Sequence, residues 1–86
     1  MFYTYVFRSK TTGKLYAGFS ADLKSRVKKH LAKGVYTTKR MGEVELIFYE
    51  AFKSKRDAQR REKYLKTTKG KRMLKLMLKE SLGPIV

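Results

Sequence analysis

The 86-residue sequence contains no cysteine and only 7 acidic residues, against 22 lysines and arginines. The lack of cysteine excludes disulfide bonds, thiolate metal sites and cysteine nucleophiles, and it is typical of proteins from a reducing cytosol. There is also no apolar run near the roughly 20 residues of a membrane span, and no basic start with a long apolar stretch as in a signal peptide. These absences predict a cytoplasmic protein without a membrane segment.

The residues that are present predict a small folded protein that binds a polyanion. A chain of this length has room for one domain, which we expect over residues 1–86, so an active site would lie on its surface. Hydrophobic residues make up 42% of the sequence, which is too many for a disordered basic tail. The formal net charge of +15 favours nucleic acid as the partner, ahead of an acidic membrane surface or an acidic protein.

The first twenty residues predict a β-hairpin. Residues 2–8 alternate with a period of two, residues 9–13 have turn composition, and residues 14–19 resume an extended pattern. The two strands should pair antiparallel, which places Tyr5 and Tyr16 on neighbouring strands. Cross-strand pairing can then bring the two phenols close together on one face of the sheet, depending on the register.

A helix of about twelve residues is predicted next. Ser20 is the expected N-cap, and the apolar residues Leu23, Val27 and Leu31 recur every four residues until Gly34.

Two polar residues of this helix, Arg26 and His30, are four positions apart, so they lie one above the other on a face beside the apolar residues. Residues 33–43 form a basic loop by composition. Residues 44–52 are rich in β-branched and aromatic side chains and predict a third strand, which we expect at the centre of the sheet.

Two further helices complete the predicted fold. A sequence that resembles a capping box at residues 54–57 begins a helix that runs to about Lys66, and residues 67–70 break or bend it. Another helix carries apolar residues from Met73 onward and closes at the Gly-Pro pair at 83–84. The order ββαβαα predicts the α+β class, with a small three-stranded antiparallel sheet flanked by helices.

Positive charge is concentrated between Lys53 and Lys75. This segment has eleven basic residues and two acidic ones, a local net charge of +9. A solvated helix face would explain a smaller excess, but self-repulsion of this size favours contact with nucleic acid. The candidate nucleic-acid-binding residues of the whole chain are Tyr3, Lys39, Arg40, Arg60, Arg61, Lys63, Lys66, Lys69, Lys71 and Arg72.

Glu62 is an acidic residue inside the basic sequence Arg60-Arg61-Glu62-Lys63. It can form salt bridges with these neighbours. It can also be a ligand for a hard cation, because Mg²⁺ keeps several waters and binds through one or two carboxylates plus substrate phosphate oxygens. From the residues alone, both interpretations stay open.

The tyrosines near the N-terminus also allow more than one role. Tyr3, Tyr5 and Tyr16 form an aromatic group, which we expect at the sheet edge, that can fill the core with its hydroxyl groups in water or stack on bases. A catalytic role would require a phenol whose pKa is lowered by cationic neighbours, so that it can take a proton from an attacking water. His30 can be an ordinary surface histidine, and Arg26 an ordinary helix cation.

Four segments together resemble the GIY-YIG nuclease domain, particularly its small stand-alone members of the UPF0213 or YhbQ-like type. The two half-motifs are represented by Tyr3-Thr4-Tyr5 and Tyr16-Ala17-Gly18, which are eleven residues apart from tyrosine to tyrosine. Residues 22–30 resemble the family's Arg-x-x-x-His segment, and residues 58–66 are similar to its glutamate-bearing helix. The resemblance covers about residues 2–80.

This resemblance implies the GIY-YIG fold and a DNA endonuclease of low sequence specificity that acts in DNA repair or on structured DNA. It implies that Tyr16 is the general base and that Tyr5 beside it contacts water or phosphate. Arg26 would clamp the scissile phosphate, and His30 would assist by hydrogen bonding or proton transfer. Glu62 would hold one Mg²⁺ or Mn²⁺. The expected partner is duplex or branched DNA rather than RNA, with no membrane contact. The sequence does not indicate whether the protein is a monomer or an oligomer.

The sequence departs from the family pattern at a few positions. Tyr3 stands where the first motif has glycine, Ala17 where the second often has isoleucine or valine, and Phe19 where some relatives have lysine. Several family nucleases use an asparagine after the glutamate, and this chain has no asparagine. The missing lysine and asparagine, with the high net charge, motivate an alternative: a non-catalytic, basic nucleic-acid-binding module on the same fold.

Overall fold

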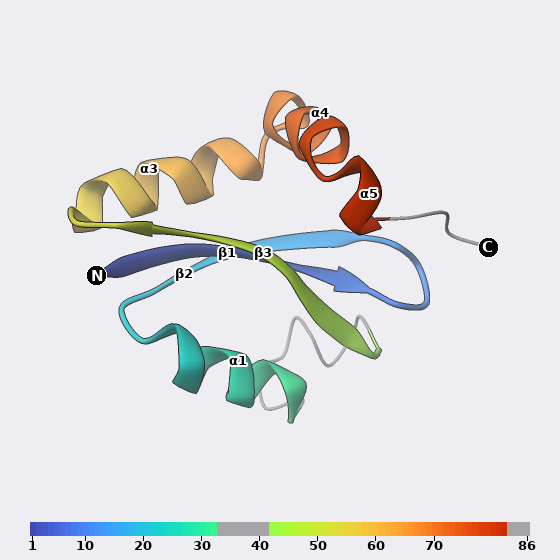
Figure 1. The fold of residues 1–86 in the computed structure, drawn as a ribbon, viewed down its shortest axis with the longest axis horizontal. Coiled ribbons are helices and arrows are strands. Elements are labelled where there is room, and N and C mark those ends of the chain that lie inside the picture. Colours follow the sequence, from blue (N-terminus) through green and yellow to red (C-terminus); the bar gives the residue numbers. More distant parts are fainter. Residues whose placement is uncertain (33–41, 83–86) are drawn as a thin grey trace.

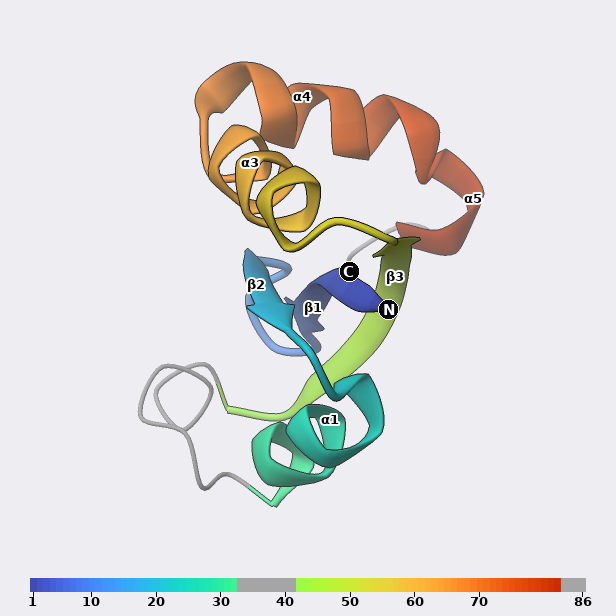
Figure 2. The ribbon, with the colours of Figure 1, turned by 90° about the vertical axis from the view of Figure 1, so that its left-hand side faces the viewer.

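The computed structural model describes residues 1–32 and 42–82. Its strands form one antiparallel sheet in the order β2-β1-β3, with bounds β1 (Phe2–Ser9), β2 (Leu15–Ser20) and β3 (Val44–Phe52). The predicted α+β class and three-stranded antiparallel sheet are therefore confirmed. The prediction that the third strand lies at the centre is wrong, because β1 occupies that position between β2 and β3 (Figure 2).

The burial of β1 explains its central place. Four consecutive residues, Thr4 to Phe7, are buried, so both faces of this strand are covered. β3 is only half-buried along most of its length, with Tyr49 and Ala51 exposed. Helices cover the two faces of such a strand, and its buried backbone groups are paired by a neighbouring strand at each edge.

Helices cover both faces of the sheet (Figure 1). One face carries α1 (Leu23–Leu31), and the other carries α3 (Lys55–Leu65), α4 (Thr68–Met77) and the short α5 (Lys79–Leu82). The last predicted helix is thus divided at Leu78 into α4 and α5. None of the helices in the described part of the chain is long and apolar enough to cross a membrane.

Each face of the sheet has its own apolar cluster. The cluster under α3 and α4 contains Val6, Ala17, Leu65, Leu74 and Leu78. The cluster under α1 contains Tyr5, Phe7 and Val44, with Leu23 and Val27 packed against it. A β-bulge shifts the register between β1 and β3 at Val6 and Phe7. Along β3, the residues that share the face of α1 are therefore even-numbered before the bulge (Val44 and Leu46) and odd-numbered after it (Tyr49 and Ala51).

The start of α1 differs from the prediction. Asp22 is the N-cap, and its side chain accepts a hydrogen bond from the Ser25 amide at 3.1 Å. Ser20 instead accepts a hydrogen bond from the Asp22 amide and so forms the turn that leads into the helix. α1 has nine residues, Leu31 at its end is more than half exposed, and His30 is buried in its place. The predicted stop at Gly34 lies outside the described residues.

The junction of α3 and α4 is tight. Ser54 is the N-cap of α3 as predicted, but its side chain makes no capping hydrogen bond, so the predicted capping box does not form. Thr67 separates the two helices and caps α4 by accepting a hydrogen bond from the Gly70 amide. Gly70 lies inside α4, where a Cβ atom would overlap the Tyr64 carbonyl of α3. The lack of a side chain therefore lets α4 approach α3 closely. The predicted stop at 83–84 falls outside the described residues.

Candidate active site

The two motif tyrosines lie on the face of the sheet that α1 covers. In the β1–β2 register, Tyr5 is opposite Gly18 and Tyr16 is opposite Phe7. The phenols are therefore diagonal neighbours on one face, as the hairpin prediction allowed. Only Tyr16 belongs to an edge strand; Tyr5, like Tyr3, is on the central strand, so the expected aromatic group at the sheet edge is only partly correct.

Gly18 determines where the Tyr5 phenol lies. A Cβ atom at Gly18 would overlap Cζ and Oη of Tyr5, so the ring lies directly over the glycine backbone. The side chain of Tyr5 thus reaches from the central strand across β2. Because Gly18 has no side chain, the Tyr5 hydroxyl group can reach the β2 side of the sheet, where Tyr16 also lies.

His30 completes this group from α1. It is fully buried, its Nε2 atom is 3.1 Å from Oη of Tyr5 in a hydrogen bond, and its ring is 4.7 Å from that of Phe7. The rings of Tyr5 and Tyr16 are each 5.7 Å from the imidazole. His30 is therefore not a surface histidine. Burial, with a smaller contribution from the Arg26 charge, lowers its pKa below the ordinary 6.5, and the imidazole is neutral at pH 7.

The Tyr5 phenol is strongly held in its protonated form. Burial, and next the neighbouring Tyr16, raise the pKa of Tyr5 to about 12; Arg26 opposes the shift and Glu62 adds to it. The lowered pKa that a catalytic phenol would need is thus absent at Tyr5. Its O–H group stays available for hydrogen bonding at neutral pH.

Glu62 approaches from the opposite face, on α3. That helix is anchored to the central strand by a buried hydrogen bond of 2.6 Å from Thr4 Oγ1 to the Ala58 carbonyl. The Glu62 carboxylate, about one-fifth exposed at 21%, forms a salt bridge of 2.9 Å with Lys66 Nζ. The same ammonium group lies 6.0 Å from the centre of the Tyr16 ring. Lys66 therefore lies between the carboxylate of α3 and the phenol of β2.

The single carboxylate of Glu62 is better suited to a hard cation that keeps bound waters than to a metal that is enclosed by protein ligands. No group of three histidine, cysteine, aspartate or glutamate residues that could hold a metal occurs in residues 1–32 and 42–82. A structural zinc site needs four protein ligands, whereas Mg²⁺ or Mn²⁺ can use one carboxylate with waters and substrate phosphate. The single partly exposed carboxylate of Glu62 therefore fits magnesium, provided that Lys66 releases it.

The basic residues of α3 are divided between two sides of the helix. Arg61 faces β3 and forms a two-point ion pair with Glu50, at 2.8 and 3.4 Å. Arg60 is highly exposed and pairs with Asp57 at 3.2 Å. The salt-bridge interpretation of Glu62 with Arg60, Arg61 or Lys63 is not what the structure has, since its partner is Lys66.

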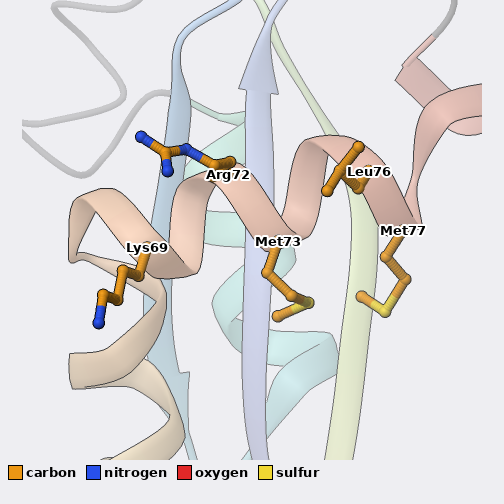
Figure 3. Close-up of a pocket in the computed structure, with 5 residues that line it drawn as sticks. All are labelled: Lys69, Arg72, Met73, Leu76 and Met77. Carbon is orange, nitrogen blue, oxygen red and sulfur yellow. The ribbon is translucent and has the colours of Figure 1, made fainter.

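Further candidate nucleic-acid contacts lie on α4. Lys69 and Arg72 line a shallow hollow of about 480 Å³ with three apolar residues of the same helix (Figure 3). Lys71, like these two, is exposed. The candidates Lys39 and Arg40 lie outside the described residues.

Of the five predicted catalytic residues, direct contacts bring together Tyr5, Tyr16 and His30. Arg26 precedes His30 by one turn of α1, and Glu62 on α3 pairs with Lys66, whose ammonium group lies 6.0 Å from the Tyr16 ring centre. Sequence reasoning missed two contributors. Gly18 was recognised only as part of a motif, although its missing side chain seats Tyr5. Lys66 was counted only among the general nucleic-acid contacts, although its spacing of four residues from Glu62 is typical of a helical ion pair.

The family model of the GIY-YIG catalytic domain matches residues 1–75 of this sequence. The chain belongs to the GIY-YIG family. It is therefore related to nucleases, and a nucleic acid is the expected class of substrate. The resemblance found in the sequence is confirmed, and the three-stranded antiparallel sheet with helices is consistent with the GIY-YIG fold.

Several curated relatives are UPF0213 proteins. The chain is 35% identical to a UPF0213 protein of Clostridium perfringens over 83 residues, which cover 95% of this chain and 88% of the relative. It is 36% identical to one of Staphylococcus saprophyticus over 76 residues, covering 87% and 92%. It is also 50% identical to the UPF0213 protein YazA of Bacillus subtilis over 52 residues, covering 59% and 52%. No solved structure matches the chain significantly.

Proposed function

We propose that this GIY-YIG protein is a divalent-metal-dependent DNA endonuclease that hydrolyses phosphodiester bonds with low sequence specificity. The observation that carries the proposal is the group of two phenols and a buried imidazole, with an arginine one helical turn away and a carboxylate whose lysine partner lies beside the Tyr16 ring. These groups come from β1, β2, α1 and α3, so only the folded chain brings them together.

The two tyrosines are suited to different steps. Tyr16 lies on the edge strand and is partly exposed, so in its deprotonated form it can take the proton of an attacking water. Tyr5 is buried, keeps its proton at neutral pH, and shares a hydrogen bond with neutral His30. Tyr5 and His30 then hold the water or a phosphate oxygen by hydrogen bonding and fix the orientation of the site.

Arg26 and Glu62 act on the phosphate from opposite sides of the sheet. The exposed guanidinium group of Arg26 can form charge-assisted hydrogen bonds that strengthen as negative charge develops on the phosphoryl oxygens. Glu62 would hold Mg²⁺ or Mn²⁺, which when bound supplies polarisation of the phosphate and stabilisation of the leaving oxygen. Cleavage of this kind leaves a 5′ phosphate and a 3′ hydroxyl group, which suits DNA repair or the processing of structured DNA.

The experiment is a cleavage assay with duplex, flapped, branched and single-stranded DNA in the presence of Mg²⁺ or Mn²⁺. Glu62→Gln and Arg26→Ala should abolish cleavage while DNA binding in EDTA is retained. The matched control is Glu80→Gln, which removes an exposed carboxylate on α5 and should cut normally. If the unaltered protein cuts none of these substrates with either metal, the proposed activity is wrong.

A second candidate function is a non-catalytic nucleic-acid-binding module on the same fold. The ion pair between Lys66 and Glu62 favours it, because a neutralised carboxylate needs no metal. This module would bind DNA with strong salt dependence, since phosphate neutralisation carries the affinity. Its binding would be indifferent to divalent metal and to Glu62→Gln, so metal dependence separates the two functions.

A further inference from the structure

A groove of about 490 Å³ lies beside α1, and none of the predicted catalytic residues lines it. The apolar residues that line it include Leu23, Val27 and Leu46. At 100° per residue, the Lys24–Lys28 row of α1 lies on the other side of the Leu23–Val27 row from Arg26. The groove therefore opens on the flank of α1 opposite the arginine.

Two tyrosines form the aromatic part of this groove. Tyr3 of β1 and Tyr49 of β3 lie side by side, with ring centres 6.2 Å apart in an edge-to-face arrangement. Tyr49 is 54% exposed although it is one of the largest side chains of the sheet. An exposed aromatic ring beside apolar lining residues offers a flat surface on which a base can stack, and such stacking tolerates any base sequence.

The charges around the groove favour an anionic occupant. Lys24 and Lys28 are both exposed and both line it. The acidic residue of the lining is Asp22, whose side chain accepts the capping hydrogen bond from Ser25. The net charge of +15 disfavours a second copy of the chain or any basic partner. A polynucleotide matches both the aromatic, apolar lining and the two lysines, since it carries flat bases next to phosphates.

We propose that this groove binds an unpaired nucleobase of the nucleic-acid substrate, stacked on Tyr49 with neighbouring phosphates on Lys24 and Lys28. The proposal rests on the proposed function for the nature of the polymer. A base inside a duplex is already paired and stacked, so only a base from a single strand, flap or bulge can enter. The substrate class is therefore DNA that has unpaired nucleotides.

The groove is close enough to the catalytic group for both to contact one substrate. Tyr49 is the cross-strand neighbour of Tyr5, which is in turn the neighbour of Gly18. Two strand spacings separate Tyr49 from Gly18, which amounts to about 10 Å. The unpaired nucleotide would thus lie near the phosphodiester that is cut, and the groove would select where in a DNA structure the cut occurs.

The first test measures binding of a short fluorescein-labelled oligothymidylate and of a duplex by anisotropy, in EDTA. Tyr49→Ala should weaken single-strand binding by about 5- to 150-fold, equivalent to about 1–3 kcal/mol for one stacked base. Duplex binding should stay unchanged. Tyr49→Phe is the matched variant, because it keeps the ring and should keep the affinity. Circular dichroism confirms that each variant is folded, which is expected at so exposed a position.

The second test concerns the two lysines. Replacing Lys24 and Lys28 together by glutamine should reduce the salt slope of single-strand binding by about 1.4, or roughly 0.7 for each phosphate contact. The control double variant changes Lys10 and Lys14, which are exposed on the hairpin loop at the other end of β1 (Figure 1), and should leave the slope unchanged. Equal losses in both double variants would show general attraction and overturn the lysine assignment.

The outcomes separate this inference from the proposed nuclease activity. If the protein cuts DNA but Tyr49→Ala binds single strands normally, the inference is wrong and the nuclease proposal stands. If it cuts no DNA but loses single-strand affinity in Tyr49→Ala, the groove is supported and the nuclease proposal fails. An oligouridylate of the same length is the third arm, and a larger loss of affinity for it would reassign the groove to RNA.

Discussion

Tyr5 and His30 share a fully buried hydrogen bond, with 3.1 Å between Oη and Nε2, that joins the central strand to α1. Both partners are neutral at pH 7, because a phenol is protonated there even without the rise in pKa that burial causes, and burial lowers the pKa of the imidazole below 6.5. The two tautomers of neutral His30 reverse the direction of this bond. The bond ties the phenol of the central strand to the one histidine of α1 inside the core of the candidate site.

Tyr5→Phe should destabilise the fold by about 1–2 kcal/mol, because one partner of a buried hydrogen bond is removed while the ring remains. Urea unfolding at neutral pH measures the change. Tyr64→Phe is the control: this α3 tyrosine is exposed, so its substitution should change the free energy of unfolding little. A Tyr5→Phe protein as stable as the unaltered one would contradict the importance of the bond.

His30 should make the fold sensitive to mild acid. Its pKa in the folded state is below the 6.5 of the unfolded chain, so the unfolded chain binds the extra proton first. Stability is therefore complete above about pH 6.5 and is lost as the pH falls below that value. The chain has only one histidine, so its imidazole proton resonance can be followed directly by NMR. A measured pKa at or above 6.5 would contradict the prediction.

Gly18→Ala should displace the Tyr5 phenol, because the added Cβ atom would overlap Cζ and Oη in a packed region. We expect a loss of about 1–3 kcal/mol, as for other overpacked cores. The cause can be isolated in a double-mutant cycle with Tyr5→Ala. The same Gly18→Ala change should cost much less in the Tyr5→Ala background, and additive losses would place the overlap elsewhere.

Arg61 and Arg60 are adjacent in the sequence, yet they should differ in role. Arg61 is 28% exposed and holds Glu50 by two contacts, whereas Arg60 is 76% exposed. Arg61→Gln should cost up to about 1 kcal/mol of stability with little effect on DNA affinity. Arg60→Gln should do the reverse, lowering DNA affinity and leaving stability nearly unchanged. Unfolding and anisotropy titrations on the two variants check this, and identical behaviour would contradict it.

Local patterns in the sequence were sufficient for the elements but not for their arrangement. The alternation in residues 2–8 and the β-branched and aromatic composition of residues 44–52 predicted two strands correctly, because both signals depend only on near neighbours. The order of the strands depends on contacts between distant segments, so the central place of β1 was missed. The β-bulge opposite Val6 and Phe7 also decides which β3 residues share the face of α1, and thus brings Tyr49 beside Tyr3.

The candidate site shows the same division. The motif resemblance identified Tyr5, Tyr16 and Glu62; the structure places the two tyrosines on the α1 face and Glu62 on α3 on the other face, with Lys66 beside both Glu62 and the Tyr16 ring. The burial of His30 was not visible in the sequence, because a polar residue that directly follows Lys28 and Lys29 has the pattern of an exposed helix face. Its burial follows from packing against Phe7, which belongs to a different segment of the chain.

Lys66 should compete with divalent metal for Glu62, since its ammonium group lies 2.9 Å from the carboxylate. Lys66→Met should therefore tighten Mn²⁺ binding in the absence of DNA, by up to about fivefold, the equivalent of about 1 kcal/mol for a partly exposed pair. Isothermal titration calorimetry measures this directly. Lys63→Met removes an exposed charge next to Glu62 in sequence and should leave the metal affinity unchanged, while Lys66→Arg should keep the competition. Weaker Mn²⁺ binding by Lys66→Met would instead mean that the lysine helps to hold the carboxylate in place for the metal.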